Sequence, residues 1–208
     1  MQGLANEHRL LRHYTHNIDC LELSLPMLEA STVRLQGRVD QLRCTRCNHT
    51  SQFKPPPFSS AGLRPCSNCE SNVEYNSKDP CKRRIGLLKP NILLYDEPDP
   101  DKDRTLESLL DDIEECPDLI LVAGMSTASE NIVNLIQDAR SQGGKTCWIN
   151  KKEPSPRLKS LFDYIYQGDC DRIARLYNSE PQPHRLTYDQ LCDHDDRLTD
   201  ILVDHVSF

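Results

Sequence analysis

Four cysteines in two closely spaced pairs are the residues of this sequence best suited to bind a metal ion. Cys44 and Cys47 form one CxxC pair, and an 18-residue gap separates them from a second pair, Cys66 and Cys69. A two-residue gap lets both thiolates of a pair reach one ion, and two pairs complete the tetrahedron that Zn²⁺ prefers. The spacing falls within the range of zinc ribbons. Four thiolates leave no coordination position open, so we expect a structural zinc ion and not a catalytic one.

Other interpretations of these cysteines stay open. They could be free thiols, or two unrelated pairs that share no ion. A redox role fits less well, because neither pair follows a strand at the start of a helix. The sequence holds 10 cysteines, and its first residues lack the apolar core of a signal peptide. Metal ligands and free thiols are therefore favoured over disulfides.

Polar residues at the ends of expected strands form a second group that could bind a ligand. Asn17 and Asp19 close the segment YTHNID, whereas Gly124–Thr127 and Asn150 each follow an apolar run. A strand, a glycine-containing turn and a helix present backbone amides to phosphate groups in α/β folds. Each feature also has a structural alternative: an Asx turn after YTHN, and a tight turn with a helix cap at Gly124. The turn GMST is not a GxGxxG fingerprint.

The elements that would position these residues alternate between strands and helices. The expected strands are 91–95, 118–123, 145–149 and 161–166, and the expected helices are 104–115, 127–142 and one that runs through Leu176. The run 118–123 is typical of a parallel strand covered on both faces. We therefore predict an α/β fold with a Rossmann-like parallel sheet.

A segment of different composition interrupts this pattern. Residues 43–78 are rich in Cys, Pro, Ser and Asn and poor in aliphatic side chains, which fits a zinc-ribbon insertion better than a hydrophobic core. We expect residues 1–42 and 79–178 to form the Rossmann-like domain around this zinc-binding module. Residues 179–208 would be a linker and a C-terminal tail.

The charge balance narrows the range of partners. The 208-residue chain has a formal net charge of −7. Binding to nucleic-acid phosphates requires clustered Lys and Arg, so we expect no direct nucleic-acid binding. No apolar run reaches the ~20 residues of a membrane-spanning helix, and we expect no membrane partner. The acidic run DEPDPDKD at 96–103 could attract basic peptides, or it could be a solvated loop.

Taken in order, the motifs of this chain resemble those of the sirtuins, the NAD-dependent protein-lysine deacylases. YTHNIDCLE is similar to the family's YTQNIDGLE, RLQGRV stands where the family has its LHG segment, and the CxxC pairs follow at the expected place. KPNILLYDE resembles RPxVVxFGE, LVAGMSTAS the GTS turn, WINKKE the INxE segment and QGDCDRIA the GDCD segment. The motifs occur in the same order as in the family, from about Leu11 to Tyr177. The variant motifs NIDCLE and LLYDE are most similar to those of the fungal branch that deacetylates histones.

The resemblance implies roles for individual residues. The catalytic positions would be Gln36, Asn17 and Asp19. The NAD⁺ contacts would come from Asn17, Asp19, Gly124, Ser126, Asn150 and Cys170. The substrate peptide would pair as an added strand with Leu93, Leu94, Tyr95, Asp96 and Glu97. The partner would be an acetyl-lysine protein, in this branch a histone, and we expect a nuclear location in preference to a cytoplasmic one.

Two departures from the family pattern bear on activity. Gln36 occupies the position of the family's catalytic histidine, and a glutamine amide takes no proton near neutral pH, so general-base assistance of about 10²–10⁴-fold should be lost. Only Met1 to His13 precede the YTHNID motif, without the family's glycine-rich GAGxS loop, so we expect the first βα unit to be missing. We therefore expect impaired or absent NAD⁺ binding and catalysis, in a truncated deacetylase or in a non-catalytic interaction module (a pseudoenzyme).

Overall fold

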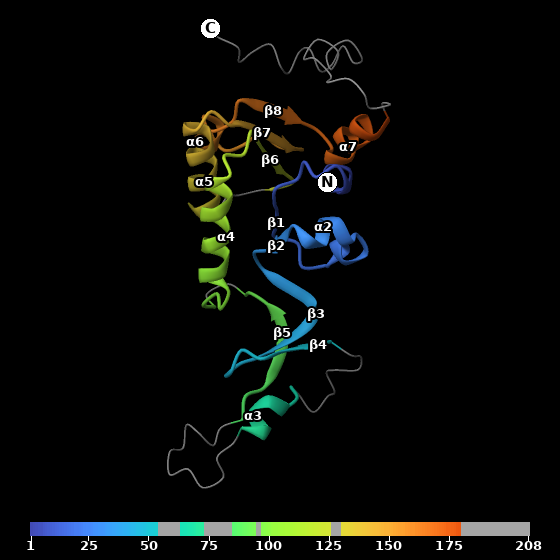
Figure 1. Ribbon diagram of the computed structural model, residues 1–208, viewed down its shortest axis with the longest axis vertical. Coiled ribbons are helices and arrows are strands. Elements are labelled where there is room, and N and C mark those ends of the chain that lie inside the picture. The colour runs from blue at the N-terminus through green and yellow to red at the C-terminus, as the bar shows by residue number, and fades with distance from the viewer. Residues whose placement is uncertain (54–62, 73–84, 95–96, 126–129, 180–208) are drawn as a thin grey trace. The chain divides into compact units, whose positions relative to one another are not determined.

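The computed structural model describes residues 1–53, 63–72, 85–94, 97–125 and 130–179. The chain divides into two compact units, Met1–Thr105 and Leu106–Phe208, with elements labelled in Figure 1. The first unit contains α1 (Gln2–Asn6), β1 (His13–Thr15), the 3₁₀ helix η1 (Leu21–Ser24), α2 (Pro26–Ala30), β2 (Thr32–Arg34), β3 (Gly37–Cys44), β4 (Thr50–Gln52), α3 (Ser67–Ser71) and β5 (Leu88–Ile92). Helix α4 (Lys102–Glu114) begins in it, and the second unit continues with β6 (Leu119–Ala123), α5 (Glu130–Ser141), β7 (Lys145–Asn150), α6 (Pro156–Lys159), β8 (Tyr164–Gln167) and α7 (Cys170–Ser179).

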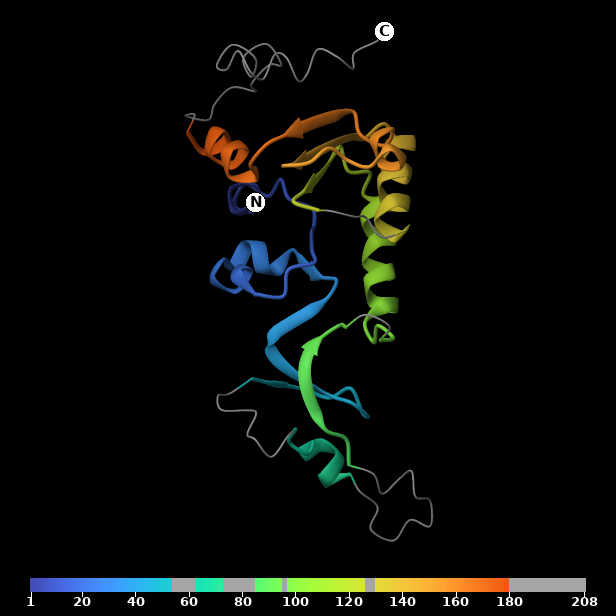
Figure 2. The same cartoon turned by 180° about the vertical axis from the view of Figure 1, so that it is seen from behind.

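A parallel three-stranded sheet in the order β6-β7-β8 forms the centre of the second unit, and Figure 2 shows it from behind. Leu119 of β6 pairs with Lys145 of β7, and Cys147 of β7 pairs with Tyr164 of β8. Helix α5 connects β6 to β7 and packs against β7. Strands and helices thus alternate along a parallel sheet, which confirms the predicted α/β class.

Helix α5 buries most of the apolar face that its periodicity predicts, which is Ile132, Val133, Ile136 and Ala139. Ile132, Ile136 and Ala139 are buried, whereas Val133 is only partly buried and Leu135 is buried in its place. The buried residues recur at spacings of three and four, which places them on one side of the helix. Gly143 then adopts a left-handed conformation with φ +93°, and Gly144 N donates to Ala139 O at 2.9 Å. A glycine after the last turn is a common end for a helix, so the predicted stop is confirmed.

Strand β7 contributes two further buried side chains, Trp148 and Thr146, to the core of the second unit. Trp148 is 2% exposed, its ring lies 5.2 Å from that of Phe162, and its Nε1 donates to Lys152 O at 2.9 Å. Thr146 is completely buried, and its Oγ1 lies 2.7 Å from Leu161 O and 2.9 Å from Asp163 Oδ2. Asp163 Oδ2 also accepts from Thr146 N, and Asp163 N donates to Thr146 Oγ1. These bonds fix the chain that leads into β8.

The first unit holds two smaller sheets. β1 and β2 form a parallel pair, with Tyr14 opposite Val33. β3 lies between β4 and β5 and is antiparallel to both; β3 and β5 lie side by side in Figure 1 and Figure 2. Between Arg38 and Leu42 the register of β3 against β5 shifts, so the middle of β3 is free to bond elsewhere.

Two strand predictions were misplaced. The strand expected at 91–95 is β5 at 88–92, because the pairing of this segment with β3 already begins at Leu88, opposite Cys44. The strand expected at 161–166 is β8 at 164–167, because the preceding Phe162 packs against Trp148 instead of joining the sheet. In both cases the apolar run overlaps the strand, but contacts with residues distant in sequence set where the strand begins and ends.

One prediction of burial was also wrong. β6 is covered on one face and not on both, since Leu119 and Leu121 remain 46% and 37% exposed while Val122 is buried. On α4, Leu109 is buried, whereas Leu106 and Leu110 are 43% and 54% exposed. The tail 180–208 lies outside the described residues. Within the part that is described, no helix has the length and apolar character needed to cross a bilayer.

Replacing Thr146 with Val should destabilise the second unit by about 1–3 kcal/mol, because Leu161 O and Asp163 Oδ2 lose the buried hydroxyl group that they contact. Trp148 is the only tryptophan of the chain, so its fluorescence during urea unfolding reports on this unit. Thr50 is exposed in β4, and the matched change Thr50→Val should shift the free energy of unfolding by less than about 0.5 kcal/mol. Equal stability of the two variants would contradict the role assigned to Thr146.

Candidate functional site

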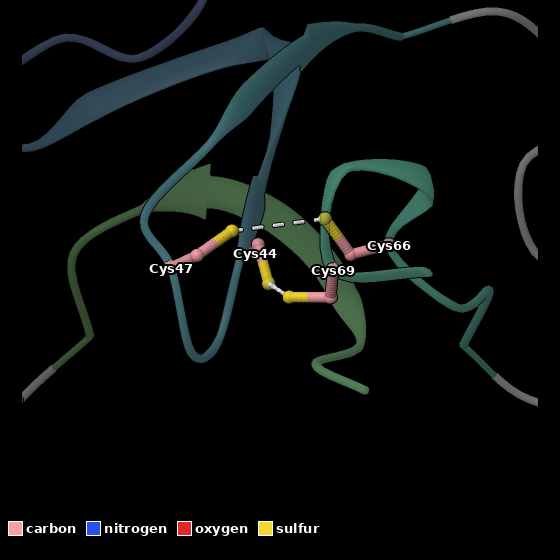
Figure 3. A group of neighbouring side chains, drawn as sticks. All are labelled: Cys44, Cys47, Cys66 and Cys69. Carbon is pink, nitrogen blue, oxygen red and sulfur yellow. Dashed lines mark hydrogen bonds between the residues drawn. The ribbon is translucent and has the colours of Figure 1, made fainter. Parts of the chain in front are cut away.

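The four predicted cysteines converge in the first unit. Their sulfur atoms all lie within 4.8 Å of one another, with Cys44 facing Cys69 at 3.6 Å and Cys47 facing Cys66 at 3.8 Å (Figure 3). A tetrahedron with Zn–S bonds of about 2.3 Å has sulfur–sulfur edges of about 3.8 Å. A disulfide would need a separation of about 2.05 Å. The sulfur arrangement therefore fits one four-thiolate zinc ion and fits no disulfide.

Local structure explains how each pair presents its thiols. Cys44 ends β3, and its N–H donates to His49 O at 2.9 Å, which closes a turn around Cys47. Asn48 in that turn has φ +56°, a left-handed conformation that Asn adopts more readily than most residues. Cys66 precedes α3 and Cys69 lies within it, so one short helical turn aims both sulfurs at the first pair.

Hydrogen bonds to sulfur favour the thiolate form that a metal requires. Asn68 Nδ2 donates to Cys47 Sγ at 3.5 Å, and this bond is the main cause that lowers the pKa of Cys47 to about 6. Arg46 N donates to Cys44 Sγ at 3.4 Å. Burial instead raises the pKa of Cys66 in the metal-free site. A bound Zn²⁺ would supply the positive charge that lets the buried thiols ionise together.

Gly86 belongs to the zinc site and was missed by the sequence prediction. A Cβ on this residue would lie 2.3 Å from Cys44 Sγ and 2.8 Å from Arg46 Cβ. The carbonyl of Gly86 accepts from Cys66 N at 2.8 Å, so its backbone runs between the two cysteine pairs. Only a glycine fits this close approach. Gly86 lies between Ile85 and Leu87, far from the first cysteine pair in sequence. Nothing in this local sequence predicts its contact with Cys44.

Backbone hydrogen bonds bring together three segments that the sequence analysis singled out. Segment 35–39, which contains Gln36, takes part in all of these bonds. Leu35 N donates to Thr15 O at 2.8 Å, and Val39 N donates to Ile18 O at 3.0 Å. On its other side, Leu93 N donates to Gln36 O at 3.0 Å. The YTHNID motif and Leu93 therefore lie on either side of Gln36.

Gln36 occupies a tight turn between β2 and β3, with its side chain exposed. Gly37 has φ +77°, and a Cβ there would lie 2.1 Å from Asn91 O. Both facts require a glycine after Gln36. The side chain at position 36 is thus set by a rigid backbone turn and is free to face a ligand.

Ion pairs brace the strands on both sides of this turn. Arg34 lies 2.5 Å from Glu29 and 3.4 Å from Glu22, with Arg34 and Glu22 side chains less than a tenth exposed. Arg38 Nε donates to Asp40 Oδ1 at 2.5 Å, and this bond lowers the pKa of Asp40. Removing one partner of such a buried pair leaves an uncompensated charge. These contacts hold the turn in place and leave Gln36 uninvolved.

Asn17 and Asp19, the predicted pocket residues of the first unit, are exposed beyond the end of β1. Asn17 N donates to Thr15 Oγ1 at 3.0 Å, and Asp19 Oδ1 accepts from Leu21 N at 3.4 Å. The second bond is the local turn that was the structural alternative for this motif. The remaining oxygens of both side chains stay available, and their contact with a cofactor stays a prediction.

In the second unit, three predicted cofactor residues lie at the carboxyl ends of β6 and β7. Gly124 N donates to Ile149 O at 3.0 Å, and Cys170 Sγ donates to the same carbonyl at 3.6 Å. The Asn150 amide donates to Met125 O. Gly124 has φ +68°, and a Cβ there would meet no atom of the described residues within 4 Å. This edge is where α/β sheets bind ligands; Ser126 lies outside the described residues.

The predicted substrate segment follows β5. Leu93 bonds to Gln36, while Leu94 and Glu97 bond to each other and Glu97 pairs with Lys89. Tyr95 and Asp96 lie outside the described residues. The acidic run is not simply a solvated loop, because Asp101 also forms an ion pair, with Arg43.

Comparison with known proteins gives the same family as the motifs. The model of the Sir2 family matches residues 1–130. The NAD-dependent protein deacetylase hst4 of Schizosaccharomyces pombe is 32% identical over 192 residues, which cover 84% of this chain and 46% of that protein. The NAD-dependent histone deacetylase HST3 of Candida albicans is 29% identical over 219 residues, which cover 90% of this chain and 45% of that protein. The chain thus spans less than half the length of these two relatives.

Solved structures show the same fold. A Sir2 homologue in complex with ADP-ribose superposes with a TM-score of 0.63 at 21% identity, over 87% of this chain and 67% of that chain. A Sir2 homologue in complex with NAD superposes with a TM-score of 0.59 at 24% identity, over 82% of this chain and 57% of that chain. The predicted Rossmann-like fold of the sirtuin type is therefore confirmed.

Replacing Cys66 with Ser should abolish zinc binding and unfold the zinc-binding module, because one of four ligands is lost from a site with little other core. The fluorescence of Trp148 should stay unchanged, since that residue lies in the second unit. Zinc content by elemental analysis and the emission spectrum test both statements. Cys116 is an exposed free thiol, so Cys116→Ser should keep its zinc. A zinc-free wild-type protein, purified without chelators, would refute the metal assignment.

Replacing Gly86 with Ala should weaken zinc retention, because the new methyl group would collide with Cys44 Sγ. We expect the rate of zinc transfer to a chromogenic chelator to rise at least about tenfold, which corresponds to about 1.4 kcal/mol. Ile85 is 43% exposed beside it, and Ile85→Ala should leave that rate unchanged. Identical rates for both variants would show that the site tolerates a side chain at position 86.

Proposed function

This chain belongs to the Sir2 family, and we propose that it carries the cofactor- and peptide-binding parts of an NAD-dependent protein-lysine deacetylase. The observation that supports this most directly is the set of backbone bonds that place the YTHNID motif and Leu93 on either side of Gln36. The relatives hst4 and HST3 are an NAD-dependent protein deacetylase and an NAD-dependent histone deacetylase. We propose an acetylated histone as the substrate and the nucleus as the place of action.

We propose roles for the residues on this basis. Asn17 and Asp19 would line the nicotinamide–ribose pocket for NAD⁺. Gly124 would meet the phosphate and ribose, Asn150 the adenosine ribose and Cys170 the adenine. Bound NAD⁺ would supply the ribose carbon that accepts the acetyl oxygen. Residues 43–78 would hold zinc without taking part in that chemistry, since four thiolates saturate the ion.

Gln36 determines how far the chemistry would proceed. Its amide can donate and accept hydrogen bonds, but it has no basic nitrogen that takes a proton near neutral pH. A general base contributes about 10²–10⁴-fold to the rate of a proton-transfer step. We propose that this chain binds its ligands and turns them over slowly or not at all.

A second candidate function is a non-catalytic interaction module, and Gln36 is the observation that favours it. The side chain at position 36 is exposed, and none of the described contacts that support the turn involves it. A substitution there would therefore remove catalysis and leave peptide binding intact. Binding of an acetyl-lysine peptide without nicotinamide release would distinguish this module from a slow enzyme.

Replacing Gln36 with His should raise NAD-dependent nicotinamide release from an acetylated histone peptide by about 10²-fold or more, because it restores a base at that position. Gln36→Ala is the matched control, and it should be as inactive as the wild-type chain. Both variants should bind the peptide with wild-type affinity in a fluorescence anisotropy assay. Robust turnover by the wild-type chain, equal to that of Gln36→His, would refute the proposed impairment.

A further inference from the structure

Glu97 forms hydrogen bonds with the main chain of Leu94, a residue of the proposed peptide-binding segment. Leu94 N donates to Glu97 Oε2 at 3.3 Å, and Glu97 N donates back to Leu94 O at 3.2 Å. Lys89 Nζ lies 2.6 Å from both carboxylate oxygens of Glu97. Leu94 itself is 55% exposed, so a partner can reach the residue, while its main-chain donor and acceptor are already engaged.

A peptide that adds to this segment as a strand needs the same groups. Strand addition uses main-chain N–H and C=O groups of the receiving segment. An N–H group has a single hydrogen, so Leu94 cannot bond fully to Glu97 and to a peptide carbonyl at once. Glu97 is therefore a direct competitor of the peptide backbone at Leu94.

The ion pair is the stronger part of this arrangement. Two contacts of 2.6 Å hold the carboxylate to Lys89, whereas its bond to Leu94 N is long at 3.3 Å. The Lys89 and Glu97 side chains are 27% and 33% exposed, so an incoming cation can compete for the carboxylate. Lys89 and Glu97 also line a cavity of about 420 Å³, together with the cations Arg34 and Arg43 and the carboxylates Asp99 and Asp101.

Glu97 differs in this respect from the other acidic residues described in the run. Asp101 is held by Arg43, and Asp99 Oδ1 accepts from Asp101 N at 2.8 Å. Neither of these bonds occupies a main-chain group of the segment 93–97. Among the described acidic residues of the run, displacement of Glu97 alone would both free a carboxylate and expose a strand donor.

We propose that Glu97 is an internal cap of the peptide-binding segment and that a basic residue next to the acetyl-lysine releases it. This inference rests on the proposed function, because it assumes that an acetyl-lysine peptide binds here. A cationic peptide side chain draws the Glu97 carboxylate away from Lys89. The Leu94 N–H group is then free to donate to a carbonyl of the peptide backbone. Glu97 thereby determines specificity for basic acetylated peptides.

The cap can be tested with Glu97→Ala and Glu97→Gln, using Asp103→Ala as the control for a lost negative charge. Asp103 is exposed in the first turn of α4. Hydrogen exchange of the Leu94 amide, followed by NMR, should be faster in Glu97→Ala than in the wild-type and Asp103→Ala proteins. Glu97→Gln should keep partial protection, because its side-chain carbonyl still accepts a bond. Unchanged exchange in Glu97→Ala would overturn the cap.

Specificity is tested with two acetyl-lysine peptides of equal length, one with flanking lysines and one with glutamines in their place. The wild-type and Asp103→Ala proteins should bind the basic peptide about tenfold more tightly, the effect expected for one charge-assisted hydrogen bond. Glu97→Ala should bind the neutral peptide more tightly than wild type does, and both Glu97 variants should lose the preference. Weaker binding of both peptides by Glu97→Ala would overturn the proposal, since Glu97 would then support the segment.

The failure of the proposed function would look different. If no protein in the series binds either peptide, the peptide-binding function and the release by a basic residue are both refuted. Faster exchange at Leu94 in Glu97→Ala would in that case still support the internal cap. Zinc content and Trp148 fluorescence confirm that each variant is folded in both units.

Discussion

At the end of β3, a group of buried thiols takes the place that apolar side chains occupy in most folds. Cys44, Cys66 and Cys69 form the buried cluster there, with Leu88 packed against it. A cluster this small removes little apolar area from water, so ligand bonds to a metal must supply most of the cohesion. A zinc ion bound by the four thiolates would therefore join segments 44–47 and 66–69. The backbone of 86–88 bonds to both segments, because Thr45 N donates to Leu87 O and Cys66 N donates to Gly86 O.

Strand β3 connects this metal centre to the candidate site. It begins at Gly37, directly after Gln36, and ends at the zinc ligand Cys44. Its register against β5 shifts between Arg38 and Leu42, and within that interval Val39 N bonds to Ile18 O. The irregular part of β3 thus bonds to the YTHNID motif, while its regular end carries the zinc ligand Cys44. Loss of zinc would loosen one end of a strand whose other end positions residue 36.

Sequence patterns predicted those features of the fold that depend on neighbours along the chain. The periodicity of α5 and the thiol spacing were sufficient, because a helical face or a CxxC pair is defined within a few residues. Features set by distant contacts escaped. The apolar run 161–166 includes Phe162, which packs against Trp148 and precedes the strand. Gly86 has no local sequence signature. The acidic run likewise looked uniform, although Glu97 and Asp101 have different partners, 8 and 58 residues away.

Residue 36 contributes to the fold through its backbone. Its carbonyl accepts from Leu93 N, so the backbone at this position supports the site. The turn depends on the glycine that follows, since Gly37 combines a positive φ with a close approach to Asn91. The Gln36 side chain is exposed and lies outside the ion pairs of Arg34 and Arg38. The identity of the side chain at position 36 therefore matters little to the stability of the fold. The four cysteines, by contrast, lie where there is little other buried core, so selection on stability alone would retain them whether or not the chain catalyses a reaction.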